Sequence, residues 1–324
     1  YMARILTGIQ STGTPHLGNI LGAIIPAIKM AEQPENDSFL FIANLHTLTQ
    51  IKDAEVLRSN TYSTAAAWLA FGLDINNTVF YRQSDIPQVT ELTWYLNCFF
   101  PYSRLKLAHS FKDKADRLED VNAGLFTYPM LMAADILLYD SEIIPVGKDQ
   151  EQHIEMTRKV ATYFHEQTDS ETFVMPQAEI QKDTMLVPGT DGEKMSKSRN
   201  NTINIFLDDI KLRKQILSIK TDSTPLEAPI DWKTCNCFAL YSLLADDTQI
   251  AEMKSNYEKG GYGYGHAKQA LFELFTKTFS EPRTRYTYYM NNLEEVDKAL
   301  SVGAEKAKKV ANTVLDRVRK KVGY

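Results

Sequence analysis

The sequence from residue 8 to residue 19 is Gly8-Ile9-Gln10-Ser11-Thr12-Gly13-Thr14-Pro15-His16-Leu17-Gly18-Asn19. It follows an apolar run, Arg4 to Ile9, that predicts a strand, and it opens a predicted helix from His16 to about Ala31. The glycines let a phosphate chain approach the backbone, and the helix N-terminus supplies unpaired N–H groups with a partial positive charge. His16 and Asn19 share one helix face, where both side chains can donate to phosphate. The stretch indicates a nucleotide site, although a simple glycine-rich turn is the alternative.

The neighbouring segments extend this pattern into a sheet. Ser38 to Ala43 (SFLFIA) is a compact apolar run typical of a buried parallel strand, and Asn77 to Gln83 is a third strand. A helix predicted from Asp53 to Phe71 separates the two. The order β-α-β-α-β predicts an α/β fold with a Rossmann-like, doubly wound parallel sheet, whose nucleotide crevices lie at the carboxyl ends of the strands.

The rest of the chain is predicted to be mostly helical. A helix from Tyr128 to Tyr139, with Pro129 in its first turn, a strand from Glu142 to Val146 and a helix from Asp149 to His165 complete the first part. From Asp208 onward the pattern is almost wholly helical. The expected organisation is an α/β domain over residues 1–200 and an all-helical domain over residues 201–291. The glycine-tyrosine cluster at residues 260–265 is predicted to be a long loop between helices.

Composition narrows the functional classes. The 324 residues are 44% hydrophobic and 24% charged, which is typical of a globular protein, and no apolar run is long enough for a membrane span. Three cysteines cannot build a disulfide framework or an all-cysteine metal site, so we expect a cytoplasmic protein with no bound metal. The net charge of −5 argues against wholesale nucleic-acid binding, but the basic run after Glu305 is either a local RNA-binding face or a solvated helix face.

A second motif, Lys194-Met195-Ser196-Lys197-Ser198, follows a predicted turn at residues 188–192. Two lysines three residues apart on a loop can reach a triphosphate as it acquires charge in a transition state. Alone, the motif could be any lysine-serine loop. Together with residues 15–19 it resembles the paired "KMSKS" and "HIGH" signatures of class I aminoacyl-tRNA synthetases.

A third motif lies in residues 124–139, where Asp135 interrupts an otherwise apolar helix. Tyr128, Met132 and Asp135 share one helix face. A buried carboxylate there must be satisfied, either by an ion pair or cap, or by a ligand in an apolar pocket. The stretch resembles the tryptophan-binding helix of bacterial-type tryptophanyl-tRNA synthetases, and residues 146–153 resemble the family's "VGxDQxxH" element. The resemblance covers nearly the whole chain and implies that Asp135 accepts the indole N–H.

The same resemblance implies a set of site residues. Those expected to bind tryptophan are Gly8, Gln10, His46, Tyr128, Met132, Asp135, Val146 and Gln150. Those expected to bind ATP are Gln10, Ser11, Thr12, Gly18, Asn19, Gly147, Lys148, Asp149, Leu186, Lys194, Met195, Ser196, Lys197 and Ser198. Those expected to be catalytic are His16, Asn19, Lys112, Lys194 and Lys197. Asn44 departs from an aspartate frequent in the family, and for His46 a core role is an equal alternative.

The resemblance implies an enzyme that activates L-tryptophan with MgATP and transfers it to tRNA(Trp), without a permanent cofactor. It also implies a homodimer and a final helix, from about residue 292 to 324, that packs back on the catalytic domain. Two alternatives stay open from the residues alone: a tyrosine-specific relative, and a catalytically silent RNA-binding paralogue.

Overall fold

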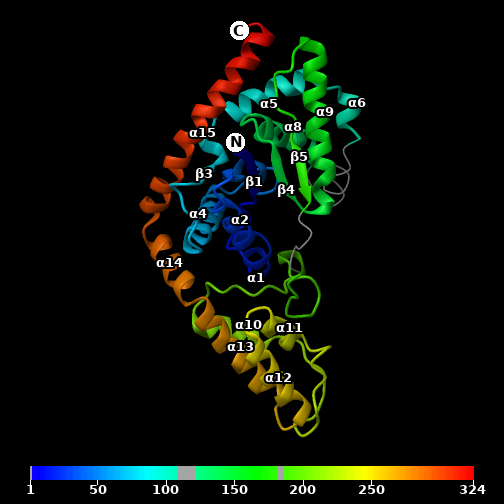
Figure 1. The fold of residues 1–324 in the computed structure, drawn as a ribbon, viewed down its shortest axis with the longest axis vertical. Coiled ribbons are helices and arrows are strands. Elements are labelled where there is room, and N and C mark those ends of the chain that lie inside the picture. Colours follow the sequence, from blue (N-terminus) through cyan, green and yellow to red (C-terminus); the bar gives the residue numbers. More distant parts are fainter. Residues whose placement is uncertain (1, 108–120, 181–185) are drawn as a thin grey trace.

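The chain builds one parallel sheet in a computed structural model that describes residues 2–107, 121–180 and 186–324. Within those residues the strands are β1 (Ala3–Ile9), β2 (Asn36–Ile42), β3 (Val79–Arg82), β4 (Ile143–Val146) and β5 (Gln177–Ile180). They lie in the order β3-β2-β1-β4-β5, and every pair is parallel (Figure 1). The chain winds outward from β1 to β3 and then returns to β4, so the switch point lies beside β1. The predicted fold class is confirmed.

The described residues of the first part contain helices at the four predicted places and three further helices for which no range was predicted. They are α1 (Leu17–Asn19), α2 (Ile25–Ala31), α3 (Asn44–Thr47), α4 (Ala54–Ala70), α5 (Gln88–Phe99), α6 (Tyr102–Leu105), α8 (Ala123–Leu137) and α9 (Glu151–Thr168). A π-helical turn, Ile20–Ile24, joins α1 to α2 within the single helix that was predicted. The Asp53 carboxylate accepts from the Val56 N–H and so begins α4 where the sequence predicts it.

The prediction for Pro129 is wrong. The Asn122 side chain accepts from the Leu125 N–H, so α8 begins at Ala123 and Pro129 lies in the helix interior. There the proline has no N–H to donate to the carbonyl four residues back. Because the N-cap residue Asn122 lies outside the apolar run, the apolar pattern alone does not mark where the helix begins.

Alternate residues of β2 enter two different hydrophobic cores. Leu40 and Ile42 pack with α4 and with the helices of the C-terminal part, whereas Phe39 and Phe41 pack with α5, α8 and α9. All four side chains are buried. The strand is therefore covered on both faces, as its uninterrupted apolar run predicts.

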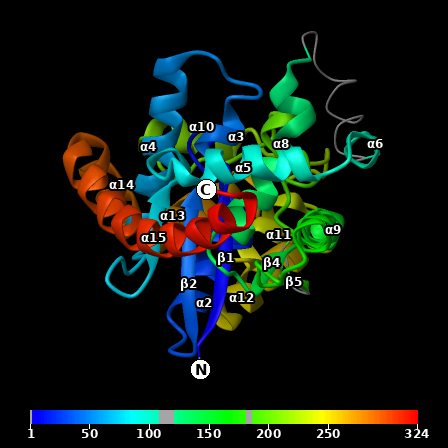
Figure 2. The same cartoon turned by 90° about the horizontal axis from the view of Figure 1, so that it is seen from above.

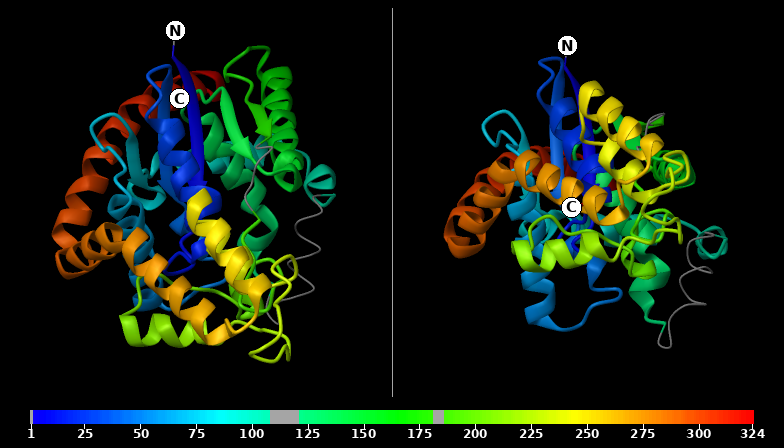
Figure 3. Two further views of the ribbon diagram at one scale, coloured as in Figure 1. Left: turned by 60° about the horizontal axis from the view of Figure 1, so that its bottom comes forward. Right: turned by 90° about the horizontal axis from the view of Figure 1, so that it is seen from below.

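The C-terminal part is mostly helical, and its first four helices gather beyond the end of the sheet (Figure 1 and Figure 3). They are α10 (Asp209–Leu217), α11 (Asn236–Ser242), α12 (Asp247–Lys259), α13 (Tyr264–Thr278), α14 (Ser280–Asn291) and α15 (Leu293–Val322). Two expectations need correction. Residues 218–235 form no helix, and the loop between α12 and α13 has only four residues because Tyr264 already belongs to α13.

The last helix, α15, returns to the sheet and runs beside β3 and α5 (Figure 2). At the crossing, Gly303 lies so close to β3 that a Cβ would come within 1.8 Å of the Phe80 carbonyl oxygen. Part of the basic run serves this packing, since Arg319 pairs with Glu91 at 2.7 Å and Arg317 pairs with Asp140. These two arginines are engaged within the protein, unlike either predicted role for the run.

Candidate active site

A cavity of about 570 Å³ opens beside the carboxyl ends of β1, β2 and β4. Its wall includes every residue that the sequence predicts for tryptophan: Gly8, Gln10, His46, Tyr128, Met132, Asp135, Val146 and Gln150. Thr12 and Gly147, predicted for ATP, line the same cavity. Three separate sequence regions, at residues 8–12, 46 and 128–150, thus meet at the crevice that the sheet topology predicts.

The floor of this cavity carries a buried carboxylate with two protein partners. Asp135, only 3% exposed, receives a hydrogen bond from His46 Nε2 at 2.7 Å on Oδ2. Gln83 Nε2 lies 2.8 Å from Oδ1 and 2.9 Å from Oδ2. Burial raises the pKa of the Asp135 carboxyl, and the hydrogen bonds from His46 and Gln83 oppose that rise. Asp135 is therefore paired within the protein and also lines the cavity, so each of the two alternatives stated for it describes part of the structure.

The first motif is organised by a reciprocal cap at the start of α1. His16 Nδ1 accepts from the Asn19 N–H at 3.3 Å, and Asn19 Oδ1 accepts from the His16 N–H at 3.2 Å. Because Nδ1 is an acceptor, a neutral His16 ring carries its proton on Nε2 and can donate from there. Burial, and then the charge of Lys197, lower the pKa of His16 to about 4. His16 is therefore a neutral hydrogen-bond donor near pH 7.

The second motif contacts the first directly. Met195 is buried, and its sulfur accepts from the Gly18 N–H at 3.4 Å. Lys197 Nζ donates to the Thr12 carbonyl at 2.7 Å, and burial lowers the pKa of Lys197. Lys194 and Ser198 are exposed and Ser196 is half-buried, and the two serine hydroxyls lie 3.2 Å apart. The two motifs, about 180 residues apart in sequence, therefore contact each other at Gly18 and Thr12. Thr12 lines the cavity, whereas His16, Gly18, Asn19 and residues 194–198 do not.

A residue that the sequence analysis missed holds the second motif in shape. Asn201 is buried; its Oδ1 accepts from the Ser196 N–H at 2.8 Å, and its Nδ2 donates to the Lys194 carbonyl at 3.1 Å and to Asp191 Oδ1 at 2.7 Å. Gly189 packs against this side chain, since a Cβ there would lie 2.3 Å from Asn201 Cγ. A polar residue three positions after the motif was the available signal.

Some predicted ATP residues lie elsewhere. The Ser11 hydroxyl is fully buried and lies 3.3 Å from the Thr61 hydroxyl. Leu186 is 68% exposed, and neither it nor Lys148 lines the cavity. Lys112 and the side chain of Asp149 lie outside the described residues.

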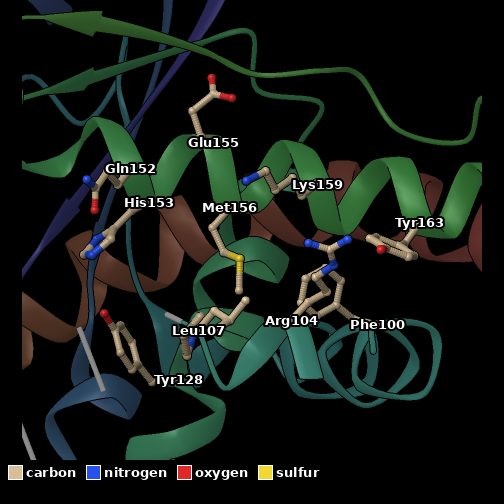
Figure 4. A pocket seen from close by; sticks show the side chains of 11 residues that line it. Phe100, Arg104, Leu107, Tyr128, Gln152, His153, Glu155, Met156, Lys159 and Tyr163 are labelled. Carbon is tan, nitrogen blue, oxygen red and sulfur yellow. The ribbon is translucent and has the colours of Figure 1, made fainter. Parts of the chain in front are cut away.

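A second cavity, also about 570 Å³, lies between α6, α8 and α9 (Figure 4). Tyr128 lines both cavities, and its ring meets the His153 and His46 rings edge to face at 6.3 Å and 6.1 Å. Apart from Tyr128, no residue predicted for either substrate lines this second cavity.

The fold and the two joined motifs define the class. The family model of class I tRNA synthetases for tryptophan and tyrosine matches residues 2–280, and the chain belongs to that family. The chain is 47% identical over 320 residues to the tryptophan–tRNA ligase of Rhodopirellula baltica, covering 99% of both chains. The structure of the Campylobacter jejuni tryptophanyl-tRNA synthetase complexed with ADP and tryptophan is 44% identical, with a TM-score of 0.95 over 99% of this chain and all of that one.

A more distant structure, the tryptophanyl-tRNA synthetase of Mycoplasma pneumoniae, is 28% identical with a TM-score of 0.78 over the whole of this chain and 98% of that one. The full-length relatives named above are bacterial tryptophan–tRNA ligases. The predicted recognition of a bacterial-type enzyme of this kind is confirmed.

Proposed function

We propose that this chain activates L-tryptophan with ATP and transfers the product to tRNA(Trp). The observation that carries the proposal is one cavity that is lined by all the predicted tryptophan residues and by Thr12, which the second nucleotide motif contacts through Lys197. An apolar cavity with one acidic group at its floor suits an indole, which is a flat apolar ring with one N–H donor. Asp135 would accept that N–H, and Met132 would pack on the ring.

The first chemical step joins tryptophan to AMP. A carboxylate oxygen of tryptophan attacks the α-phosphorus of ATP, the bond between the α-phosphorus and the bridging oxygen breaks, and pyrophosphate leaves. No protein nucleophile is required, because positioning and charge stabilisation supply the catalysis. The neutral His16 would donate from Nε2 to a phosphate oxygen, beside Asn19, while Lys194 and Lys197 would bind the departing pyrophosphate. Mg²⁺ would enter with ATP as part of the substrate.

Lys197 must exchange one partner for another in this scheme. Its ammonium donates to the Thr12 carbonyl, and binding of a triphosphate at the same place would offer it phosphate oxygens instead. A charged acceptor forms a stronger hydrogen bond than a carbonyl. Lys112, by the resemblance, would join the same phosphate chain.

The second step transfers the amino acid. The terminal adenosine of tRNA, through its 2′-hydroxyl, attacks the carbonyl carbon of tryptophanyl-adenylate, and AMP leaves. We assign ATP and tryptophan binding to residues 1–200, anticodon recognition to the helices of residues 201–291, and a supporting role to the last helix. A homodimer formed through the catalytic part and a cytoplasmic location complete the proposal. No helix among the described residues could cross a membrane.

ATP–pyrophosphate exchange without tRNA tests the first step. Parallel reactions contain tryptophan, tyrosine or no amino acid. Exchange that depends on tryptophan alone supports the proposal, and charging of tRNA(Trp) then tests the second step. Exchange with tyrosine instead would make the chain a tyrosine enzyme, and exchange with neither would favour a silent RNA-binding paralogue.

A further inference from the structure

Gln83 is a buried side chain that neither the motifs nor the predicted site includes. It is the first residue after β3, in a short 3-10 turn, Gln83–Asp85, at the same edge of the sheet as the cavity. The residue is only 1% exposed, although it does not line the cavity itself. A buried amide of this kind needs all its polar atoms paired.

The partners of Gln83 fix which way its amide points. Its Oε1 accepts from the Leu45 N–H at 3.0 Å and from the His46 N–H at 3.4 Å, at the start of α3. Its Nε2 donates to the Asp135 carboxylate. A flipped amide would place oxygen against the carboxylate and N–H groups against N–H groups, so only one orientation is satisfied.

Counting acceptor positions shows what remains for a ligand. A carboxylate offers about four lone-pair positions on its two oxygens. Oδ2 of Asp135 faces both His46 Nε2 and Gln83 Nε2, whereas Oδ1 has Gln83 as its only partner among the described residues. Asp135 also forms part of the cavity wall. The carboxylate is thus held from one side and retains acceptor capacity on Oδ1.

We propose that Gln83 is a positioning residue for substrate selection: it fixes the rotation of the Asp135 carboxylate so that Oδ1 accepts one N–H from the amino-acid side chain. This inference rests on the proposed function, because it assumes that tryptophan occupies the cavity. Gln83 acts through Asp135 and touches neither substrate. The hydrogen bonds of Gln83 also join the end of β3 to α3 and α8. The orientation of the Asp135 carboxylate therefore depends on the sheet as well as on α8, the helix that carries it.

The groups around Asp135 predict how Gln83 affects the protonation of the Asp135 carboxyl. His46 on α3 and Gln83 after β3 stabilise the charged form of Asp135, while burial opposes it. Burial, and to a smaller extent the charge of Asp135, raise the pKa of the Tyr81 and Tyr139 hydroxyls. Without the Gln83 donor, the pKa of Asp135 rises further. A protonated carboxyl loses part of its acceptor capacity, so recognition of an N–H would weaken at a higher pH than in the unmodified chain.

The test measures discrimination between tryptophan and its benzothiophene analogue, 3-(3-benzothienyl)alanine, in which sulfur replaces the indole N–H. The readout is the ratio of kcat/KM for the two substrates in ATP–pyrophosphate exchange. In Gln83→Met, which has nearly the same length but no polar atoms, we expect the ratio to fall about 10- to 100-fold, as for loss of one hydrogen bond to a charged group. The KM for ATP should change less than about twofold.

A second variant separates selection from simple support of α3. Gln83→Glu retains an acceptor for the Leu45 and His46 N–H groups but loses the donor toward Asp135. At pH 8.5 we expect the same loss of discrimination. At pH 6 the two facing carboxyls share a proton, which supplies a donor again, so discrimination should partly recover. A merely structural role predicts no such recovery.

Gln88→Met is the matched control, because Gln88 makes its hydrogen bond to Asn312 on α15, away from the cavity. It should leave the ratio unchanged. Unchanged discrimination in both Gln83 variants, with tryptophan exchange intact in the unmodified chain, overturns the inference. So does full discrimination in Gln83→Glu at both pH values with loss in Gln83→Met, since support of α3 alone would then explain the effect. Absence of tryptophan exchange in the unmodified chain would instead refute the proposed function.

Discussion

Replacing Asn201 with alanine should slow tryptophan activation without weakening tryptophan binding. The side chain makes three hydrogen bonds from a buried position, to the Ser196 N–H, the Lys194 carbonyl and Asp191. Asn201→Ala leaves the first two of these backbone groups without their partner beneath the loop. The loop would then lose the shape that places Lys197 beside Thr12.

The magnitude follows from those three bonds. At about 1 kcal/mol each, a net loss of about 3 kcal/mol is expected for the ordered loop relative to its alternatives. If the ordered loop is the form that stabilises the transition state, about 3 kcal/mol corresponds to a decrease of roughly a hundredfold in kcat. The cavity lined by Asp135 is untouched, because Asn201 does not line it.

The assay is single-turnover formation of tryptophanyl-adenylate, with tryptophan affinity measured separately by calorimetry without ATP. Asn204→Ala is the control, since Asn204 caps the following turn by accepting from the Phe206 N–H and does not contact the motif. A rate within threefold of the unmodified chain would refute the reasoning. An equal decrease in tryptophan affinity would also refute it, because the damage would then extend beyond the loop.

Three further outcomes are expected. The pKa of His16 is about 4, below its ordinary value of 6.5, so the neutral ring adds stability that is present above pH 6.5 and is lost as the pH falls toward 4. In urea unfolding, the free energy of unfolding should therefore decrease less between pH 7 and pH 5 for His16→Gln than for the unmodified chain. Gly303→Ala forces a Cβ against the Phe80 carbonyl, so the free energy of unfolding should fall by about 1–3 kcal/mol in the same assay. Asp135→Asn keeps the shape of the floor but removes its charge, and kcat/KM for tryptophan should fall about 10- to 100-fold in pyrophosphate exchange; an unchanged value would refute the role of the carboxylate.

Much of the fold was predictable because its signals are local. The run of Ser38 to Ala43 alternates between two cores, so both faces of the strand had to be apolar. The strand β5, Gln177–Ile180, escaped prediction because it is an edge strand whose side chains are mostly exposed, and its residues carry no apolar run. The non-helical segment of residues 218–235 was also not predicted, because strongly helical patterns lie on both sides of it.

The site was predictable where a motif supplied it. His16, Asp135 and Lys197 belong to recognisable stretches; Asp135 lines the cavity, and Lys197 contacts Thr12, which lines the same cavity. Gln83 acts through its hydrogen bond to Asp135, and this pairing is a tertiary contact between residues 52 positions apart. No periodicity or spacing in the sequence encodes that contact.

The close approach of Gly303 to β3 also has a consequence for how the chain is made. The strand leaves the ribosome well before the helix that covers it, because β3 ends at Arg82 and α15 begins at Leu293. At ordinary elongation rates, the intervening residues take on the order of ten to forty seconds to synthesise. During that interval the surface of β3 that later packs against α15 is uncovered. The newly synthesised sheet must therefore complete its packing only after α15 emerges, or be covered by something else until then.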